Sequence, residues 1–530
     1  MAEKDQRQSA KACDVIPAAN VDTLRLISGI AWKIEMKTFL RLLVLLLIAG
    51  SFAQASDRPP NVIIFLADDL GYGDLACYGN PIVQTPHLDQ FASEGVRLTD
   101  CHSGGTVCSP SRAALLTGRN PYRSGFFYIH NRNTYLRDEE VTLAEVLKQE
   151  GYETAFWGKW HLSTLEKTRY VHPGPGEQGF DYWMGTTLNA FDKLGGPRSP
   201  KAFIKNGEPL GAVDGWYCDV IVDDARDWLA NQRNKQKPFF MYVCSHEPHT
   251  PIDPPQEYSA RYDNAEVERL EKQIRYGRVN RPQRDISGYK KDYYGTVNQL
   301  DDAFGRLMKT LEEQGLKENT LVLFTSDNGP ETPVTLEESR GQWEDPIRDK
   351  CFGSPGVLRG MKRYPYEGGH RVPGLVRFPG VIPAGTNSDV LFNGTDILPT
   401  VCGLVGAKVP ANRNVDGVDA FSAFLGQQVR RNDSAIWFFP HHGDTWFRMP
   451  QISMRRGHFT LVAWLPKRSD GVLLDEWLAT SDPDRVELYD VSVDPAQSND
   501  IASEFPEIVS SMKQEMTSLW REMRDEGLSI

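Results

Sequence analysis

The sequence predicts an α/β protein, in which a large, mostly parallel mixed sheet lies between layers of helices and a smaller antiparallel α+β subdomain follows. The first observation is three continuous apolar runs, at 61–67, 238–244 and 320–325, because strands that are buried on both faces have this composition. The second is that stretches with helical spacing, at 142–150 and 294–314, separate these runs. Alternation of buried strands and helices is typical of a sheet covered on both faces.

The sequence changes character after about residue 430. Four short segments there read as strands, and the last stretch, 506–526, reads as a helix. We therefore expect a large domain over residues 56–430 and a smaller antiparallel subdomain over 431–530. The predicted strands of this subdomain are 435–439, 451–454, 459–464 and 486–489.

Residues 36–55 have the pattern of a secretory signal peptide. Lys37 and Arg41 form a basic start, 42–50 is an apolar run, and Ala-Gln-Ala at 53–55 is a small-residue cleavage site. The apolar run is shorter than the roughly 20 residues that span a bilayer. We expect an exported protein, periplasmic, extracellular or lysosomal according to its host, without stable membrane insertion.

Residues 1–35 have none of these marks and precede the signal segment, so we interpret them as a mis-assigned leader and Met36 as the true start.

The composition is that of a globular chain with a sizeable core: of 530 residues, 40% are hydrophobic and 25% charged. These values exclude a disordered, collagen-like or coiled-coil protein. The 59 basic and 71 acidic residues give a net charge of -12. Such a charge argues against binding nucleic acid or an anionic membrane through the general surface field. An anionic substrate would need a local basic pocket.

Seven cysteines follow the predicted signal segment. Their number is odd, no CxxC pair occurs, and their spacing indicates no zinc site. An exported protein permits disulfides, but one cysteine must be left over, and Cys108 is the candidate for a special role. The seven are Cys77, Cys101, Cys108, Cys218, Cys244, Cys351 and Cys402.

Acidic pairs follow two of the predicted strands. Asp68 and Asp69 come after 61–67, and Asp327 and Asn328 come just after 320–325. In parallel sheets such positions meet at the edge where ligands bind. The alternative is that each side chain caps a following helix. Gathered carboxylates repel one another, so two such pairs favour a cation held by hard oxygen ligands, Ca²⁺ or Mg²⁺ rather than zinc.

The most specific segment is Cys-Ser-Pro-Ser-Arg at 108–112, which continues as Ala-Ala-Leu-Leu-Thr-Gly-Arg to residue 119. By itself it predicts a turn into a helix, with Ser109 as cap and Pro110 in the first turn. A helix that begins at Cys108 would direct backbone N–H groups toward it, which favours an anion there.

This segment resembles the signature of the sulfatase family. The resemblance extends from about Pro60 to the C-terminus, and it is closest to members of the arylsulfatase A and N-acetylgalactosamine-6-sulfatase type. It implies an alkaline-phosphatase-like fold and the hydrolysis of sulfuric esters, with sulfated carbohydrates as the expected substrates. The matching blocks are 61–73, 158–161, 246–251, 326–329, 358–362 and 366–373, with 487–491, 494–495 and 499–502 in the tail.

The resemblance implies that a formylglycine-generating enzyme oxidises Cys108 to Cα-formylglycine. One hydroxyl of the aldehyde hydrate would attack sulfur and release the alcohol, and the other would then expel sulfate and restore the aldehyde.

The resemblance also implies a role for each matched residue, although a lone lysine or histidine is more often a surface or core residue. Together the basic members would supply the local positive pocket. His246, three residues before His249, is expected only to support the site. Ca²⁺ would be held by Asp68, Asp69, Cys108, Asp327 and Asn328; Arg112 and Lys159 would orient the hydrate; His161 would take its proton; and His249 and Lys362 would contact sulfate and help to protonate the leaving alcohol.

Four segments are candidates for the substrate-binding rim: 172–200, 261–291, 331–351 and 439–447. The charged segment 261–291 reads as a solvated helix face. In the last segment His441, His442 and Trp446 could bind a sugar, but a packed loop at a domain junction is an equal alternative.

Two other functions stay open. Related enzymes of the alkaline phosphatase superfamily hydrolyse phosphate or phosphonate monoesters on a similar scaffold. The chain could also be an inactive relative that only binds sulfated glycan, although all matched site residues are present.

Overall fold

The computed structural model describes residues 58–530 except 132, 167–170, 192–193, 272–289, 332–352, 432–433, 441–449 and 470. The predicted leader and signal segments lie outside this part, as do His441, His442 and Trp446. Residues 58–530 form one compact unit. In the described part no helix is long and apolar enough to cross a membrane, and no disulfide joins the cysteines.

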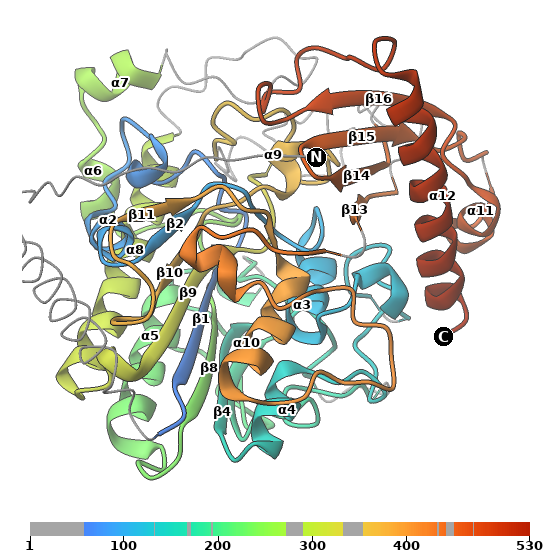
Figure 1. The fold of residues 1–530 in the computed structure, drawn as a ribbon. Helices are drawn as coiled ribbons and strands as arrows, with labels where there is room; N and C mark the ends of the chain where they lie inside the picture. The colour runs from blue at the N-terminus through green and yellow to red at the C-terminus, as the bar shows by residue number, and fades with distance from the viewer. Residues whose placement is uncertain are drawn as a thin grey trace, which may run out of the picture. The chain divides into compact units, whose positions relative to one another are not determined.

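A large mixed sheet forms the centre of this unit (Figure 1). Its five central neighbours, β9, β1, β8, β4 and β5, run parallel, and β10 runs antiparallel to β9. The predicted fold class is confirmed. The strand order is β11 (Thr386–Ser388), β2 (Val96–Leu98), β10 (Gly374–Arg377), β9 (Thr320–Ser326), β1 (Asn61–Ala67), β8 (Phe239–Cys244), β4 (Glu153–Lys159), β5 (Tyr182–Thr186), β6 (Ile204–Lys205) and β7 (Glu208–Pro209).

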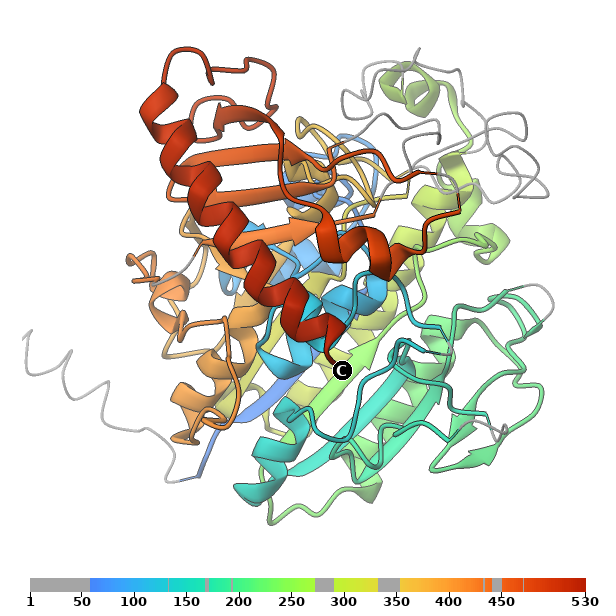
Figure 2. The same cartoon turned by 90° about the vertical axis from the view of Figure 1, so that its right-hand side faces the viewer.

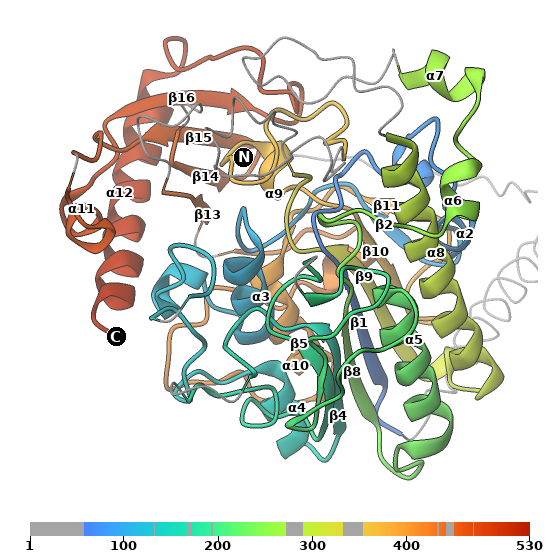
Figure 3. The same ribbon diagram turned by 180° about the vertical axis from the view of Figure 1, so that it is seen from behind.

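Helices cover both faces of the sheet, because successive side chains of a strand point to opposite faces. Ile63 and Phe65 of β1 pack toward α2 (Pro86–Ser93), α5 (Tyr217–Asp227) and α8 (Lys290–Glu313). Val62 and Ile64 pack toward α3 (Cys108–Thr117), α4 (Leu143–Gln149) and α10 (Ile397–Val405). Figure 3 shows α5 and α8 on the face opposite to α3 and α10.

Shorter elements lie outside these layers, and two of them correct the sequence-based rim. The segment 172–200 contains β5, which is a strand of the main sheet, and so it is not rim throughout. In 261–291, Glu266 and Arg269 form an exposed pair as expected, but Glu271 is buried. The short elements are α6 (Gln256–Ala260), α7 (Ala265–Glu271), α9 (Glu367–His370) and the pair β3 (Cys101–His102) and β12 (Phe392–Asn393).

A separate four-stranded antiparallel sheet follows, as predicted, with strand order β13, β14, β15, β16. Helix α12 lies across this sheet (Figure 2) and packs Met512, Met516 and Trp520 into its core. The domain boundary between residues 430 and 431 stays a prediction. The elements are β13 (Ala435–Phe438), β14 (Ile452–Arg456), β15 (Phe459–Trp464), β16 (Arg485–Asp490), α11 (Leu474–Thr480) and α12 (Pro506–Leu528).

A buried polar network joins this sheet to the segment that precedes Cys108. Asp100 accepts hydrogen bonds from His102 Nε2 at 2.9 Å and from Arg455 Nη2, on β14, at 3.1 Å. Trp437, on β13, donates to the carbonyl of Ser103 at 2.7 Å, and its ring stacks on His370 at 3.9 Å. The network ties the C-terminal sheet to residues 100–103 and to His370.

Loss of Arg455 should therefore destabilise the protein. Arg455→Ala leaves the carboxylate of Asp100 buried with fewer cationic partners, and we expect the free energy of unfolding to fall by about 3 kcal/mol. Arg456, the next residue on the strand, pairs with Glu515 near the surface, so Arg456→Ala should cost below about 1 kcal/mol. Denaturant titration of both variants checks this. Equal losses in the two would contradict the role given to Asp100.

Candidate active site

The parallel strands bring the candidate residues to one edge of the sheet. Asp68 and Asp69 follow β1, Asp327 follows β9, Lys159 ends β4, and His249 lies five residues beyond β8. Because these strands are neighbours with the same direction, their carboxyl ends meet.

Helix α3 begins at Cys108, and all ten of its residues are buried. Pro110 is in its first turn, as expected, but Ser109 does not cap the helix, because the N-cap residue is Val107. Ser109 Oγ instead donates to the carbonyl of His161 at 2.7 Å and accepts from the backbone N–H of His130 at 2.8 Å. The residue after Cys108 therefore holds two loops of the site in place.

The acidic side chains converge on Cys108. One ligand atom each of Asp68, Asp69, Cys108 and His249 lies within 4.8 Å of those of the others, and all four residues are buried. The capping alternative fails for the pair after β1, because the next helix, Ala76–Tyr78, starts several residues later with Leu75 as its cap.

Three buried cations face these carboxylates. Lys159 Nζ pairs with Asp68 Oδ2, and Lys362 Nζ lies 2.8 Å from Asp69 Oδ2. Arg112 donates from Nε and Nη2 to Asp327 Oδ2, at 3.0 and 2.7 Å. Three positive side chains thus balance the three carboxylates of Asp68, Asp69 and Asp327.

Two oxygens of the cluster lack a partner. Asp68 Oδ1 and Asn328 Oδ1 are buried without a hydrogen bond in the described structure. Burying such oxygen atoms without a hydrogen-bond partner costs free energy. Oxygen atoms of this kind are the ligands that a hard cation prefers. The residues present therefore fit Ca²⁺, and a divalent cation would give the balanced site a net positive charge that suits an anion.

The two neighbouring aspartates differ in protonation. Burial opposes ionisation of Asp68, but the positive charges of Lys159 and Arg112 hold its pKa well below the ordinary value. Burial raises the pKa of Asp69 to about 7, although Lys362 acts against the rise, and the charge of Asp68 adds to it.

Calcium binding should weaken as the pH falls below about 7. The metal-free protein then takes a proton on Asp69, whose pKa in the unfolded chain is near 3.9. Protonation therefore favours the metal-free fold as the pH falls from 7 toward 4, while a bound cation needs the carboxylate. Calorimetric titration of metal-free protein from pH 5.5 to 8 should give up to about a tenfold weaker affinity per pH unit on the acid side. An affinity constant across this range would contradict the ligand role of Asp69.

The two histidines of the site are neutral at pH 7. Burial lowers the pKa of both well below the ordinary value, helped by Lys159 at His161 and by Lys362 at His249. His161 Nδ1 is buried without a hydrogen bond in the described structure, and His249 Nδ1 donates to the carbonyl of Thr250 at 2.5 Å.

Backbone strain gathers at this site. Asp69, His161 and Arg363 have φ angles of 63°, 57° and 75°, in the left-handed region that residues other than glycine rarely adopt. Strained residues of this kind cluster where function fixes their position.

The thiol of Cys108 is also neutral. Burial raises its pKa to about 12, although Lys159 and Lys362 act in the opposite direction. An unmodified cysteine would be a weak nucleophile here, since the thiolate is the reactive form.

Two residues of the site were missed in the sequence. Asn189 donates from Nδ2 to Asp68 Oδ2 at 2.9 Å and contacts His246 Nδ1 at 3.1 Å, so it links His246 to Asp68. The carbonyl of His246 also accepts from the N–H of His249 at 2.9 Å. Asn189 follows β5, and the short apolar run at 182–184 with polar residues after it was the available signal. Glu331 lies 3.6 Å from Lys362 Nζ; it is the first residue of the predicted rim segment 331–351, but no pattern predicted its contact with Lys362.

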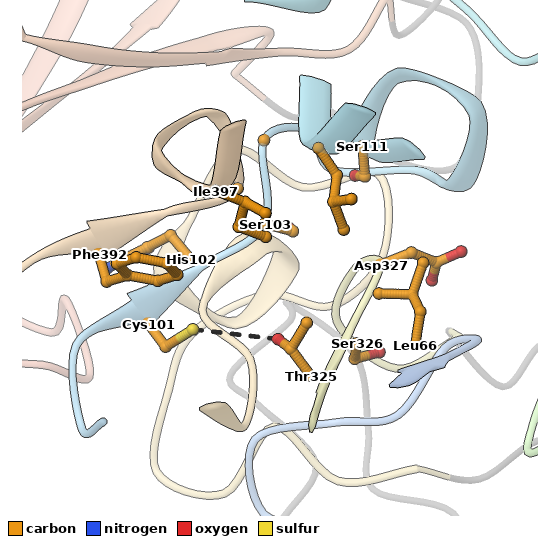
Figure 4. Close-up of a pocket in the computed structure, with 13 residues that line it drawn as sticks. Leu66, Cys101, His102, Ser103, Ser111, Thr325, Ser326, Asp327, Phe392 and Ile397 are labelled. Carbon is orange, nitrogen blue, oxygen red and sulfur yellow. Dashed lines mark hydrogen bonds between the residues drawn. The ribbon is translucent and has the colours of Figure 1, made fainter. Parts of the chain in front are cut away.

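A small cavity lies behind the cluster, between α3 and the ends of β1 and β9 (Figure 4). Its wall is largely apolar, with Leu66, Ile397 and Phe392 among the lining residues, and Cys101 Sγ faces Thr325 Oγ1 at 3.9 Å. The cavity touches the back of Asp327 and does not extend the anion site.

Comparisons with known proteins agree with this geometry. The model of the Sulfatase family matches residues 60–407, and that of the N-sulphoglucosamine sulphohydrolase C-terminal region matches 360–522. The chain is 33% identical to arylsulfatase A of Homo sapiens over 504 residues, which cover 88% of this chain and 89% of that protein. It is 32% identical to N-acetylgalactosamine-6-sulfatase of Canis lupus familiaris over 443 residues, 79% of this chain and 75% of that protein.

Solved structures share the fold. The structure of Ps i-CgsB in complex with k-i-k-neocarrahexaose matches with a TM-score of 0.69 and 24% identity, over 89% of this chain and 94% of that one. The phosphonate monoester hydrolase of Agrobacterium radiobacter matches with a TM-score of 0.58 and 20% identity, over 88% and 96%. At these identities the likeness concerns the fold alone.

Proposed function

Because the chain belongs to the sulfatase family and is a sulfuric ester hydrolase, we propose that Cys108, converted to Cα-formylglycine, and a calcium ion form its catalytic centre. The calcium ligands are the oxygens of Asp68, Asp69, Asp327 and Asn328, with the modified residue 108. Sulfated carbohydrates are its natural substrates.

One observation carries this proposal: Cys108 lies at the start of a buried helix, among carboxylates and cations, with a thiol that stays neutral. A neutral thiol could not attack a sulfate ester efficiently. The hydrate of formylglycine supplies an oxygen nucleophile at the same place, and a positively charged surrounding lowers the energy of the charge that develops on the sulfate oxygens.

The chain's own residues then have separate tasks. Arg112 holds the carboxylate of Asp327, and Lys159 holds that of Asp68, so both ligands stay oriented. Burial raises the pKa of Asp327, and Arg112 acts against this rise. His161 is neutral with Nδ1 unpartnered, so it can accept the proton of the hydrate hydroxyl. Calcium, when bound, acts as a Lewis acid toward a sulfate oxygen.

The leaving alcohol needs a proton and a fixed sulfate. His249 Nδ1 donates to a carbonyl, so Nε2, which lies 3.5 Å from Asp69 Oδ2, is the nitrogen that faces the site. Lys362 Nζ reaches the same carboxylate oxygen. Both groups contact the sulfate. Lys362 is protonated, whereas neutral His249 carries its proton on Nδ1. His249 Nε2 would therefore take up a proton when the anionic substrate binds, and would then deliver it to the alcohol.

Maturation and location are part of the proposal. A formylglycine-generating enzyme modifies Cys108, the segment 36–55 directs export, and the mature chain comprises a catalytic domain, 56–430, and a C-terminal subdomain, 431–530. Similarity to a protein named N-acetylgalactosamine-6-sulfatase supports a sulfated sugar as substrate.

Side-by-side kinetics test this function. Sulfated monosaccharides and disaccharides, nitrophenyl sulfate, nitrophenyl phosphate and a phosphonate monoester are assayed with the modified, calcium-loaded protein. We expect kcat/KM for the sulfate esters to exceed that for the phosphorus esters by at least about a hundredfold. A preference for phosphate or phosphonate would contradict the proposal, as would binding of sulfated glycan without turnover.

A further inference from the structure

We propose that His102 and His370 form a hydrogen-bonded histidine pair that positions residues 100–107, the segment leading to Cys108, and that the pair opens when both rings are protonated. The effect on turnover rests on the proposed function, through the role of residue 108, whereas the opening of the pair does not. Neither histidine touches the substrate, so both are positioning residues.

The two rings meet in a buried contact. His102 and His370 are 1% and 0% exposed, and their Nδ1 atoms lie 2.9 Å apart. One Nδ1 must therefore carry a hydrogen while the other accepts it. His102 Nε2 donates to Asp100 Oδ1 at 2.9 Å, and the ring of His370 stacks on Trp437 at a centroid distance of 3.9 Å. These contacts fix the position of both rings.

The charged groups around the histidine pair balance without a proton on either ring. Asp100 faces Arg455 at 3.1 Å and Arg371 at 3.5 Å. Glu367, which lies in the same buried cluster as the two rings, faces the same arginines at 3.5 and 3.1 Å. No surplus negative charge is left to stabilise a second proton. The carboxylates further out are also paired: Asp396, after β12, with Arg431, and Asp327, across the cavity (Figure 4), with Arg112.

A second proton would break the contact between the rings. With both rings protonated, each Nδ1 bears a hydrogen, and two N–H groups face each other. Burial lowers the pKa of His370 well below the ordinary value; a charge on His102 and the two arginines act in the same direction, and the carbonyl of Pro365 acts against them. A histidine in the unfolded chain takes its proton near pH 6.5. The open state therefore binds more protons than the closed one below this pH, so the closed state loses stability as the pH falls.

Backbone contacts connect the histidine pair to Cys108. The carbonyl of His370 accepts from the N–H of Ser103 at 2.8 Å, and Ser103 Oγ donates to the carbonyl of Gly105 at 2.7 Å. The same carbonyl of Gly105 accepts from Ser111 Oγ, on α3, at 3.0 Å. Opening of the pair would release these contacts and displace the start of α3. The protein is therefore suited to a compartment near neutral pH and not to an acidic, lysosome-like one.

Hydrogen exchange at pH 7.5 and pH 5, corrected for the intrinsic pH dependence of exchange, tests the opening. Peptides that cover residues 100–107 should lose protection at pH 5 in wild type. Because His370 takes its proton only in the open state, it alone should favour that state up to about thirtyfold more at pH 5 than at pH 6.5. In His370→Asn this pH-dependent loss should be absent, since an amide can donate or accept in place of Nδ1. Strand β1 should stay more protected than this segment at both pH values.

Turnover of nitrophenyl sulfate at pH 7.5 tests the positioning. His370→Leu leaves His102 Nδ1 buried without its partner. We expect kcat to fall about tenfold while KM changes less than about threefold, because the sulfate contacts lie on other segments. His370→Asn, which keeps the hydrogen bond, should restore most of kcat. His458→Asn is the control, since His458 is 55% exposed beside Asp490, and it should leave both kcat and the pH dependence of protection unchanged.

Either of two results would overturn the inference. An equal loss of protection at pH 5 in wild type and His370→Asn would mean that protonation does not open the histidine pair. A kcat of folded His370→Leu equal to that of wild type would mean that the pair does not position residue 108. Failure of the proposed function is distinguishable, because wild type would then turn over no sulfate ester while the exchange experiment would still report on the pair.

Discussion

Cys108→Ala is expected to lower kcat/KM for sulfate esters by at least about 10⁴-fold while the protein stays folded, because it removes the nucleophile of a covalent mechanism. The substitution is small, and Cys108 is 2% exposed at the start of α3, so the helix and the ion pairs of Lys159 and Lys362 remain. Calcium affinity should fall only in part, because the oxygen ligands of Asp68, Asp69, Asp327 and Asn328 remain, and affinity for sulfated ligands should change little. Steady-state assays and thermal unfolding of the variant measure both parts.

Cys101→Ala is the matched control. Cys101 is buried as well, and its Sγ contacts Thr325 rather than the acidic cluster. We expect it to cost stability, as core truncations do, while kcat stays within a few-fold of wild type. If Cys108→Ala kept more than about a hundredth of the activity, the catalytic role of this residue would be wrong.

Asp68→Asn is expected to abolish both calcium binding and activity. Asp68 Oδ2 accepts hydrogen bonds from Lys159 and Asn189. Asp68 Oδ1 has no hydrogen-bond partner in the described structure, and we assign it to the metal. The asparagine keeps the shape but removes one of three carboxylates, so the site becomes positive before any cation binds. We expect at least about a hundredfold loss of calcium affinity and a loss of kcat of about 10³-fold or more.

Unfolding experiments with and without calcium measure the loss of calcium binding in Asp68→Asn directly. For wild type, calcium at a hundred times its Kd should add about 2.7 kcal/mol of stability, and Asp68→Asn should lose this gain. Asp74→Asn is the control, since Asp74 is an equally buried carboxylate that accepts from Tyr293, Gly71 and Ser354 outside the cluster. The control should keep the calcium-dependent gain. Stoichiometric calcium in Asp68→Asn would contradict the assignment.

The central strands of the fold were predictable where their sequence is uniformly apolar. The runs at 61–67 and 320–325 became β1 and β9 almost residue for residue, and with them the positions of Asp68 and Asp327. A strand that is buried on both faces has no alternation of polar and apolar residues, so its sequence is a continuous apolar run that is easy to recognise.

Strands β4 and β5 were missed because their glycines imitate turn signals. Gly158 of β4 has a φ of 98°, and a Cβ there would come within 1.9 Å of the carbonyl of Cys244 on β8. Gly185 of β5 pairs with Gly158, and a Cβ at Gly185 would come within 2.8 Å of the carbonyl of Gly158. These glycines are required by strand packing, which is visible only after the strands are paired.

Some residues of the candidate site were predictable from local sequence patterns, and others were not. The acidic pairs came from strand ends, and Cys108 from its motif, but Lys159, His161, His249 and Lys362 came from family resemblance. Lys362 reaches the site through a hydrogen bond from its N–H to the carbonyl of Pro330, a tertiary contact without a local pattern. Asn189, Glu331 and Arg363 depend on the same kind of contact.

The central claim is that residue 108 acts as Cα-formylglycine. Peptide mass spectrometry of the protein purified from its own export pathway tests it most directly. The account predicts that the peptide containing residue 108 has the mass of an aldehyde in place of the thiol, and that the chain starts at Ser56. An unmodified thiol at residue 108, in fully active protein, would contradict it.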